Sequence, residues 1–177
     1  LRFAYNNPKL FLSDITNERG EQYQLRYYSN GLVASEIDFA GRKTGYVYDL
    51  NGKLTEKQEF SSTDDTVLVT RFVRDVMGRL VKKILPDRSE ISYQYDPSGN
   101  LVAVSDGHWP LHYEYDHANR LIAEHQGFAT SRFAYNALGQ LEKNKLPDGN
   151  VLSYHYARGG LLSRIELNEQ LLTRHHY

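Results

Sequence analysis

Residues 93–101 read Tyr-Gln-Tyr-Asp-Pro-Ser-Gly-Asn-Leu, and this stretch decides the fold because its pattern recurs along the chain. Residues 46–54 read Tyr-Val-Tyr-Asp-Leu-Asn-Gly-Lys-Leu, and residues 133–141 keep the pattern with Phe as the first aromatic and Asn after the second. A fixed step of about 21 residues is typical of a repeat architecture. The second aromatic of each pair, or its equivalent, stands at Tyr5, Tyr27, Tyr48, Arg74, Tyr95, Tyr115, Tyr135, Tyr156 and Tyr177.

Each repeat contains two turns whose residue types have a physical cause. Asp or Asn after the second aromatic closes an Asx turn through its side chain, and Gly three residues later permits positive φ, which Asn also tolerates. A Pro-Asp-Gly sequence marks the second turn, because Pro fixes φ and the other two residues supply a side-chain hydrogen bond and a left-handed backbone. The predicted turn residues are Asp49, Gly52, Asp96, Gly99, Asp116, Asn119, Asn136, Gly139, Pro147, Asp148 and Gly149.

Short strands fill the segments between these turns. The two aromatics of a pair lie two residues apart, so both point to one face of a strand. No stretch has a persuasive helical period of apolar residues. We therefore predict an all-β fold of tandem β-hairpin repeats, each about 21 residues long, that form a long curved antiparallel ribbon. The predicted core residues are Tyr46, Tyr48, Leu54, Tyr93, Tyr95, Leu101, Tyr113, Tyr115, Leu121, Phe133, Tyr135, Leu141, Tyr154 and Tyr156.

The tyrosines of this face have two interpretations. Tyrosines one repeat apart can stack on each other and hold the ribbon together. Alternatively, an exposed row of rings can stack on sugars. Residues 1–177 are predicted to form a single array, in which the polar run at residues 60–66 is a hairpin insertion on the surface.

Composition excludes several classes of protein. The chain has no cysteine among its 177 residues, so disulfides and thiolate metal sites are absent. Its net charge of -1 gives no reason to expect nucleic-acid binding. No apolar run is long enough for a membrane-spanning helix. The first residues show no signal-peptide pattern, and we expect the chain to be a segment of a longer polypeptide with any targeting signal elsewhere.

A search for chemistry finds no catalytic constellation. The repeated aspartates are explained as turn formers, and an active site needs one constellation rather than several equivalent ones. The nucleophile-elbow and phosphate-loop motifs are missing. The histidines are interpreted as surface residues because no usable ligand spacing is present. We therefore predict no catalytic residues, no metal site and no cofactor.

The repeated motif resembles the RHS/YD-repeat family, which includes bacterial Rhs polymorphic toxins, toxin-complex C subunits and wall-associated YD-repeat proteins. The resemblance covers essentially all of the chain and rests on the Tyr-Asp-x-x-Gly-x-Leu cores at 48–54 and 95–101 and the Pro-Asp-Gly turn at 147–149. It implies an RHS-type shell. Asp96-Pro97-Ser98-Gly99 is similar to the cleavage element of bacterial members, but it stands in mid-array and is interpreted as an ordinary turn.

The resemblance also implies a function. The chain is expected to be a non-catalytic segment of a shell that encapsulates or carries a C-terminal toxin in bacterial competition or virulence. Its partners would be the remainder of its own polypeptide, with further repeats and the toxin cargo, and secretion-machinery or immunity proteins. The parent would be made in the cytoplasm and then secreted or displayed at the cell surface. The alternative is an extracellular carbohydrate-binding or adhesion module that uses the tyrosine-rich face.

Overall fold

The computed structural model describes residues 1–176, and these contain seventeen β-strands and no helix. The chain divides into two compact units, residues 1–90 and 91–177. Tyr177, the last position of the repeat pattern, lies outside the described residues. The predicted fold class, an all-β chain of antiparallel hairpin repeats, is confirmed.

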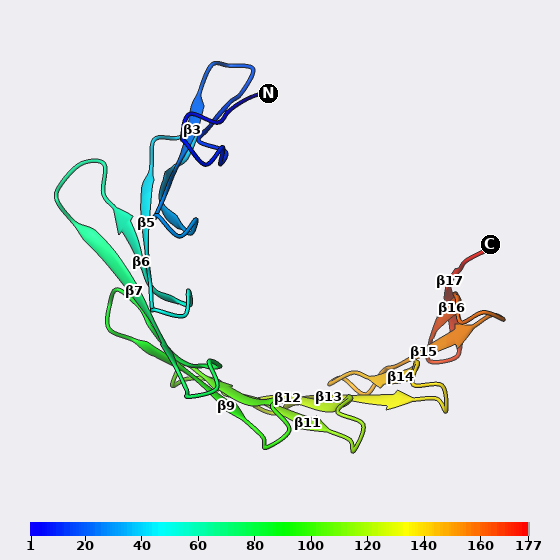
Figure 1. The fold of residues 1–177 in the computed structure, drawn as a ribbon. Helices are drawn as coiled ribbons and strands as arrows, with labels where there is room; N and C mark the ends of the chain where they lie inside the picture. Colours follow the sequence, from blue (N-terminus) through cyan, green and yellow to red (C-terminus); the bar gives the residue numbers. More distant parts are fainter. Residues whose placement is uncertain (177) are drawn as a thin grey trace. The chain divides into compact units, whose positions relative to one another are not determined.

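The first unit is a meander in which consecutive strands pair antiparallel (Figure 1). Its polar insertion forms an exposed loop at residues 61–66, closed by a hydrogen bond of 2.9 Å from the Ser61 amide to the Thr66 carbonyl. The strands are β1 (Arg2–Ala4), β2 (Asp14–Thr16), β3 (Gln22–Tyr27), β4 (Val33–Ile37), β5 (Lys43–Tyr48), β6 (Leu54–Phe60), β7 (Val67–Arg74) and β8 (Leu80–Ile84).

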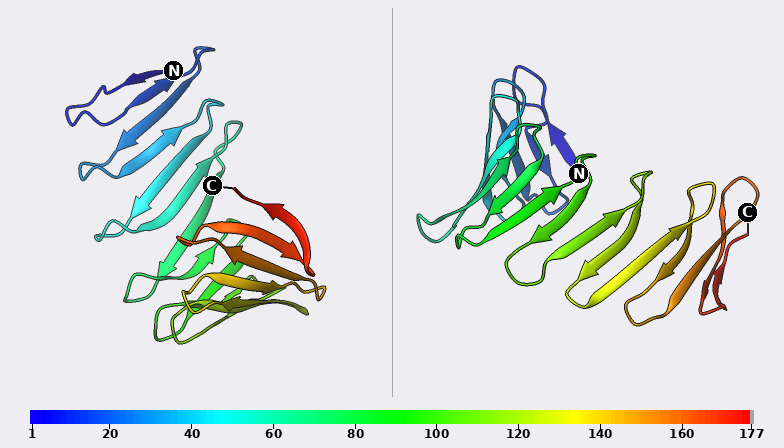
Figure 2. Two further views of the ribbon diagram at one scale, coloured as in Figure 1. Left: turned by 90° about the vertical axis from the view of Figure 1, so that its right-hand side faces the viewer. Right: turned by 90° about the horizontal axis from the view of Figure 1, so that it is seen from below.

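The second unit repeats this arrangement, and both views of Figure 2 show its turns alternating between two edges of the sheet. The strands are β9 (Glu90–Tyr95), β10 (Leu101–Ser105), β11 (Leu111–Tyr115), β12 (Leu121–Gln126), β13 (Ala129–Tyr135), β14 (Leu141–Lys145), β15 (Val151–Tyr156), β16 (Leu162–Leu167) and β17 (Gln170–Arg174).

The register within the hairpins is irregular at the same place in successive repeats. The partner of the second aromatic is the Leu that follows the turn, as in Tyr48↔Leu54 and Tyr115↔Leu121, and one extra residue of the second strand bulges beside this pair. A bulge increases the local twist and bends the strand. Because the bulge recurs once in each repeat, the bend recurs as well.

Each unit is a single layer, so its interior is thin. The buried hydrophobic residues among those described are Ala103 and Ala123, and no large side chain is fully buried. The residues predicted as core are half-buried. In a β-sandwich a second sheet would cover this aromatic face and bury its side chains. Here no other element of the same unit covers it.

The two kinds of turn have the expected backbone. Gly52, Gly99 and Gly139 have φ of +75°, +90° and +78°, and Asn119 takes the same position with φ of +59°. In the second kind of turn the Gly149 amide donates to the Leu146 carbonyl at 3.0 Å, with φ of +89°.

Arg88 occupies the position of Gly149 in the equivalent Leu-Pro-Asp turn of the first unit, with φ of +70°. A left-handed backbone destabilises the folded state by about 1–2 kcal/mol when the residue has a side chain. Substitution by Gly removes this strain, but the greater freedom of Gly in the unfolded chain offsets about 0.5–1 kcal/mol of the gain. Arg88→Gly should therefore raise the free energy of unfolding by up to about 1 kcal/mol.

Urea unfolding followed by circular dichroism measures this change, and Gly149→Ala is the matched opposite substitution. It should lower the free energy of unfolding by about 1 kcal/mol. A loss of stability in Arg88→Gly would contradict the assigned backbone strain.

Candidate functional site: the repeat-to-repeat contacts

The turn after the second aromatic is closed by one carboxylate or amide oxygen. Asp49 Oδ1 accepts hydrogen bonds from the amides of Asn51 at 2.9 Å and Lys53 at 2.8 Å. The Gly52 amide donates to the Asp49 carbonyl at 3.0 Å. Asn136 Oδ1 accepts in the same way from the amides of Leu138 and Gln140. The turn is therefore closed by hydrogen bonds from the amides of Asn51, Gly52 and Lys53 to the oxygens of Asp49.

In two of these turns the carboxylate also binds an arginine four residues later. Asp75 lies 2.7 Å from the Arg79 guanidinium, and Asp116 lies 2.7 Å from that of Arg120. The Arg120 amide and its guanidinium lower the pKa of Asp116 from its usual value. In the turn that lies between these two in the chain, the side-chain amide of Asn100 lowers the pKa of Asp96. The carboxylate is thus held charged by its own turn.

The residue that follows the glycine position reaches the next turn along the chain. Lys53 covers Gly78 and Arg120 covers Gly139, such that a β-carbon at these glycines would lie 3.8 and 3.7 Å from the covering side chain. Asn119 stands in place of glycine, and its side-chain oxygen accepts a 2.8 Å hydrogen bond from the side-chain amide of Asn100. Consecutive turns are therefore joined side by side within each unit.

The tyrosine hydroxyls make a second repeat-to-repeat contact. The pairing of β12 with β13 runs from Gln126↔Ala129 to Ala123↔Arg132, and it leaves Leu121 outside the ladder. The Tyr135 hydroxyl reaches across and donates to the Leu121 carbonyl at 2.8 Å. The same bond, from the tyrosine to the leucine of the preceding repeat, is made by Tyr27 to Leu12, Tyr115 to Leu101 and Tyr156 to Leu141.

The expected stacking of tyrosines at equivalent positions of consecutive repeats is not made by Tyr115, Tyr135 and Tyr156. The rings of Tyr28 and Tyr48 meet edge-on with centroids 6.1 Å apart, but over residues 1–176 no ring contact joins Tyr115, Tyr135 and Tyr156 to one another. Equivalent positions in consecutive repeats are separated by two strands, or about 10 Å. Stacked rings need centroids within about 7 Å. The Tyr135 ring instead lies 4.7 Å from the Arg120 guanidinium.

Glu36 is a functional residue of this face that the sequence reasoning missed. Its two carboxylate oxygens accept from the hydroxyls of Tyr23 at 2.5 Å and Tyr46 at 2.6 Å. Tyr23 and Tyr46 belong to successive repeats, so the carboxylate bridges them. The hydrogen bond to Glu36 raises the pKa of Tyr23 to about 12, and burial together with the same carboxylate raises the pKa of Tyr46.

The histidines and carboxylates of the described residues do not gather into a metal-binding cluster. Over residues 1–176 no group of three or more His, Asp or Glu side chains is arranged to hold a metal ion. Two histidines pair with a glutamate across a hairpin, His125 with Glu114 and His155 with Glu166, each at 3.0 Å. Within the same residues no helix has the length and apolar character to cross a membrane.

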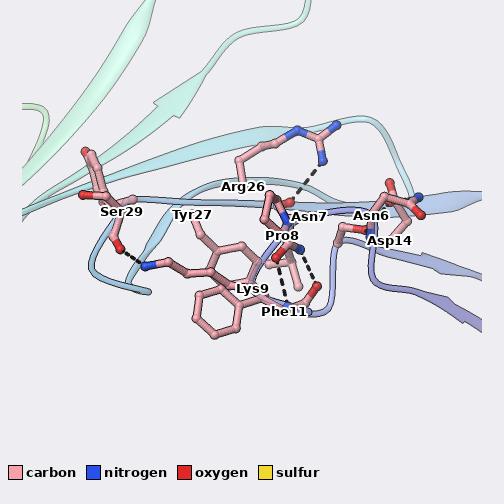
Figure 3. A pocket seen from close by; sticks show the side chains of 12 residues that line it. Asn6, Asn7, Pro8, Lys9, Phe11, Asp14, Arg26, Tyr27 and Ser29 are labelled. Carbon is pink, nitrogen blue, oxygen red and sulfur yellow. Dashed lines mark hydrogen bonds between the residues drawn. The ribbon is translucent and has the colours of Figure 1, made fainter.

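A cavity of about 590 Å³ lies beside the first turn of the array (Figure 3). Phe11, Leu25 and Tyr27 form its apolar lining, and the Phe11 and Tyr27 rings lie 5.1 Å apart. Lys9, Asp14 and Arg26 are the charged residues of the lining. No predicted site residue lies here, because this first turn departs from the repeated pattern.

Comparison with known families now identifies the repeat. Residues 74–108 match the RHS Repeat family model. This stretch is similar to an RHS repeat. It contains the 93–101 motif, so the resemblance that the sequence indicated is confirmed there.

The RHS-repeat fold is also found in solved structures. A crystal structure of TcdB2-TccC3 aligns with a TM-score of 0.70 and 18% identity, covering 82% of this chain and 9% of that chain. The Photorhabdus luminescens Tc holotoxin pore aligns with a TM-score of 0.70 and 17% identity, covering 85% of this chain and 9% of that chain. The protein therefore spans less than a tenth of the length of these chains. No curated protein matches the sequence.

Replacing Tyr135 with Phe should lower the free energy of unfolding by about 1–2 kcal/mol, because the Leu121 carbonyl loses its donor while the ring remains. Urea unfolding measures the change. Tyr5→Phe is the matched control: Tyr5 is 52% exposed, and a change within about 0.5 kcal/mol is expected. An equal loss of unfolding free energy in the two variants would contradict a stabilising bond from the Tyr135 hydroxyl to the Leu121 carbonyl.

The Tyr23–Glu36 bond should be visible in the alkaline pH dependence of stability. A folded-state pKa raised from 10.0 to about 12 contributes stability that is present below pH 10 and is lost as pH rises through 12. Urea unfolding at stepwise pH should therefore show a steeper loss over this window in the wild type than in Tyr23→Phe. Parallel curves would show that Tyr23 ionises as it does in the unfolded chain.

Proposed function

We propose that this chain is a non-catalytic wall segment of an RHS-type shell, and that the shell encloses or carries a toxin within a longer polypeptide. The observation that carries the proposal is the bond from a tyrosine hydroxyl to the leucine carbonyl of the preceding repeat, which Tyr27, Tyr115, Tyr135 and Tyr156 all make. Each repeat uses its distinctive residues to hold its neighbour. Such a chain can be extended by adding repeats, which is what a container wall requires.

The likeness to TcdB2-TccC3 supports the same proposal at the level of the fold. A wall also needs few reactive groups, and the described residues place their carboxylates in turns and hairpin ion pairs. In this proposal the partners are the rest of the parent polypeptide and its cargo, with secretion or immunity proteins acting on the assembled shell. The parent would act outside the cell in bacterial competition or virulence.

The carbohydrate-binding alternative has less support on the tyrosine face. Stacking on a sugar needs an exposed ring face. Here the hydroxyls of Tyr115 and Tyr135 are used by backbone carbonyls, and both rings are half-buried. A glycan-array screen of the protein that gave saturable binding, retained in Tyr115→Phe and abolished in a folded Tyr115→Leu variant, would favour this alternative over the wall.

The wall proposal can be tested in the parent polypeptide by limited proteolysis. A segment enclosed by the shell should resist cleavage at protease concentrations that digest the same segment expressed alone. The double variant Tyr115→Phe and Tyr135→Phe should shorten the time of protection, because opening becomes easier when two bridges are lost.

Tyr5→Phe is the control and should leave protection unchanged. Enclosure by this wall would be contradicted if all segments of the wild-type parent outside the array were cleaved as fast as the same segments expressed alone.

A further inference from the structure

The first turn of the array is one residue longer than the others, and this changes its surface. Asn7 takes the part of the aspartate: its side-chain oxygen accepts from the Phe11 amide at 3.0 Å, and its side-chain amide donates to the Phe11 carbonyl at 2.6 Å. Leu10 takes the glycine position with φ of +55°. Asn6 is the additional residue. The turn therefore keeps its closing hydrogen bonds although its loop is one residue longer.

Phe11 takes the position of the covering side chain. It lies over Gly31, where a β-carbon would be 3.2 Å from the ring, and against the Tyr27 ring. The equivalent residue in another turn is Lys53, which lines a cavity of about 380 Å³ between turns 49–53 and 75–79. The groove beside Phe11 is larger, at about 590 Å³, and has an aromatic floor. This volume is within the range of small-ligand sites.

Two opposite charges stand at the ends of this groove. Figure 3 shows the Lys9 amine beside Ser29 at one end and Asp14 at the other, with the two rings between them. The Lys9 amine donates to the Ser29 carbonyl. Asp14 accepts from the Ser13 hydroxyl at 2.7 Å and from the Asn6 side-chain amide at 3.4 Å. Over residues 1–176 no ion pair joins Lys9 or Asp14 to an opposite charge.

We propose that this groove binds a short apolar peptide with both ends free, the carboxylate at Lys9, the ammonium at Asp14 and the apolar side chains on Phe11 and Tyr27. Two charges of opposite sign at the two ends select a ligand that carries the complementary pair. Apolar side chains would displace water from the aromatic floor. The site goes beyond the role of the wall, because an ordinary turn has no such groove.

The probe is the dipeptide phenylalanyl-leucine, titrated into the protein and followed by calorimetry and by amide chemical shifts of residues 6–29. We expect saturable binding with shifts confined to these residues. The carboxyl-amidated and amino-acetylated dipeptides should each bind about tenfold more weakly, because each loses one charge-assisted hydrogen bond.

Lys9→Met should weaken the free dipeptide about tenfold and leave the amidated one unchanged, and Asp14→Asn should do the same for the acetylated one. Lys53→Met, in the smaller groove, is the matched control and should change nothing. If circular dichroism shows that Asp14→Asn is unfolded, the binding of the free and amidated dipeptides to Lys9→Met still tests the proposal. No saturable binding, equal binding of the blocked peptides, or an equal effect of Lys53→Met would overturn the proposal.

Discussion

A sheet without a second layer has to be held together along its own plane, and this constraint shapes every repeat. Adjacent strands supply the backbone ladder, but the ladder between hairpins stops before the turn at one edge, as at Ala123↔Arg132. The Tyr135 hydroxyl meets the Leu121 carbonyl beyond that point. An unpaired carbonyl on a half-buried face is costly, and the tyrosine removes that cost while its ring covers the same strand. This explains why tyrosine, rather than phenylalanine, recurs at the second aromatic position.

The turn contacts and the tyrosine contacts join the same pairs of adjacent repeats. A side chain such as Arg120 closes its own turn through Asp116, covers Gly139 of the next turn and lies on the Tyr135 ring. One residue therefore links three features of two repeats. Contacts of this kind reach only the adjacent repeat, so stability accumulates by nearest-neighbour terms, as in other repeat proteins. The departure at the first turn shows the converse, since one added residue keeps the closing bonds but opens a groove beside Phe11.

Much of this could be predicted from the sequence, because the determining interactions are local. The period, the Asx turns and the left-handed glycine positions follow from residue types a few positions apart. The role of Glu36 could not be predicted, since its two partners come from the strands on either side and a single glutamate in a strand has no distinctive spacing. The predicted stacking is not made by Tyr115, Tyr135 and Tyr156, because equivalent positions in sequence are not neighbours in space. Two intervening strands place those rings beyond contact.

The sequence by itself determined the repeat, its strands and turns, and which face carries the aromatics, because each depends on bonds within one hairpin. Only the tertiary structure decided how one hairpin holds the next. Hydroxyl-to-carbonyl bonds, the covering of Gly78 and Gly139, and the bridge at Glu36 join residues that the sequence separates by a whole repeat or half of one. Their partners are selected by strand register and by the bulge beside the second aromatic, and these are properties of the paired backbone rather than of any one segment.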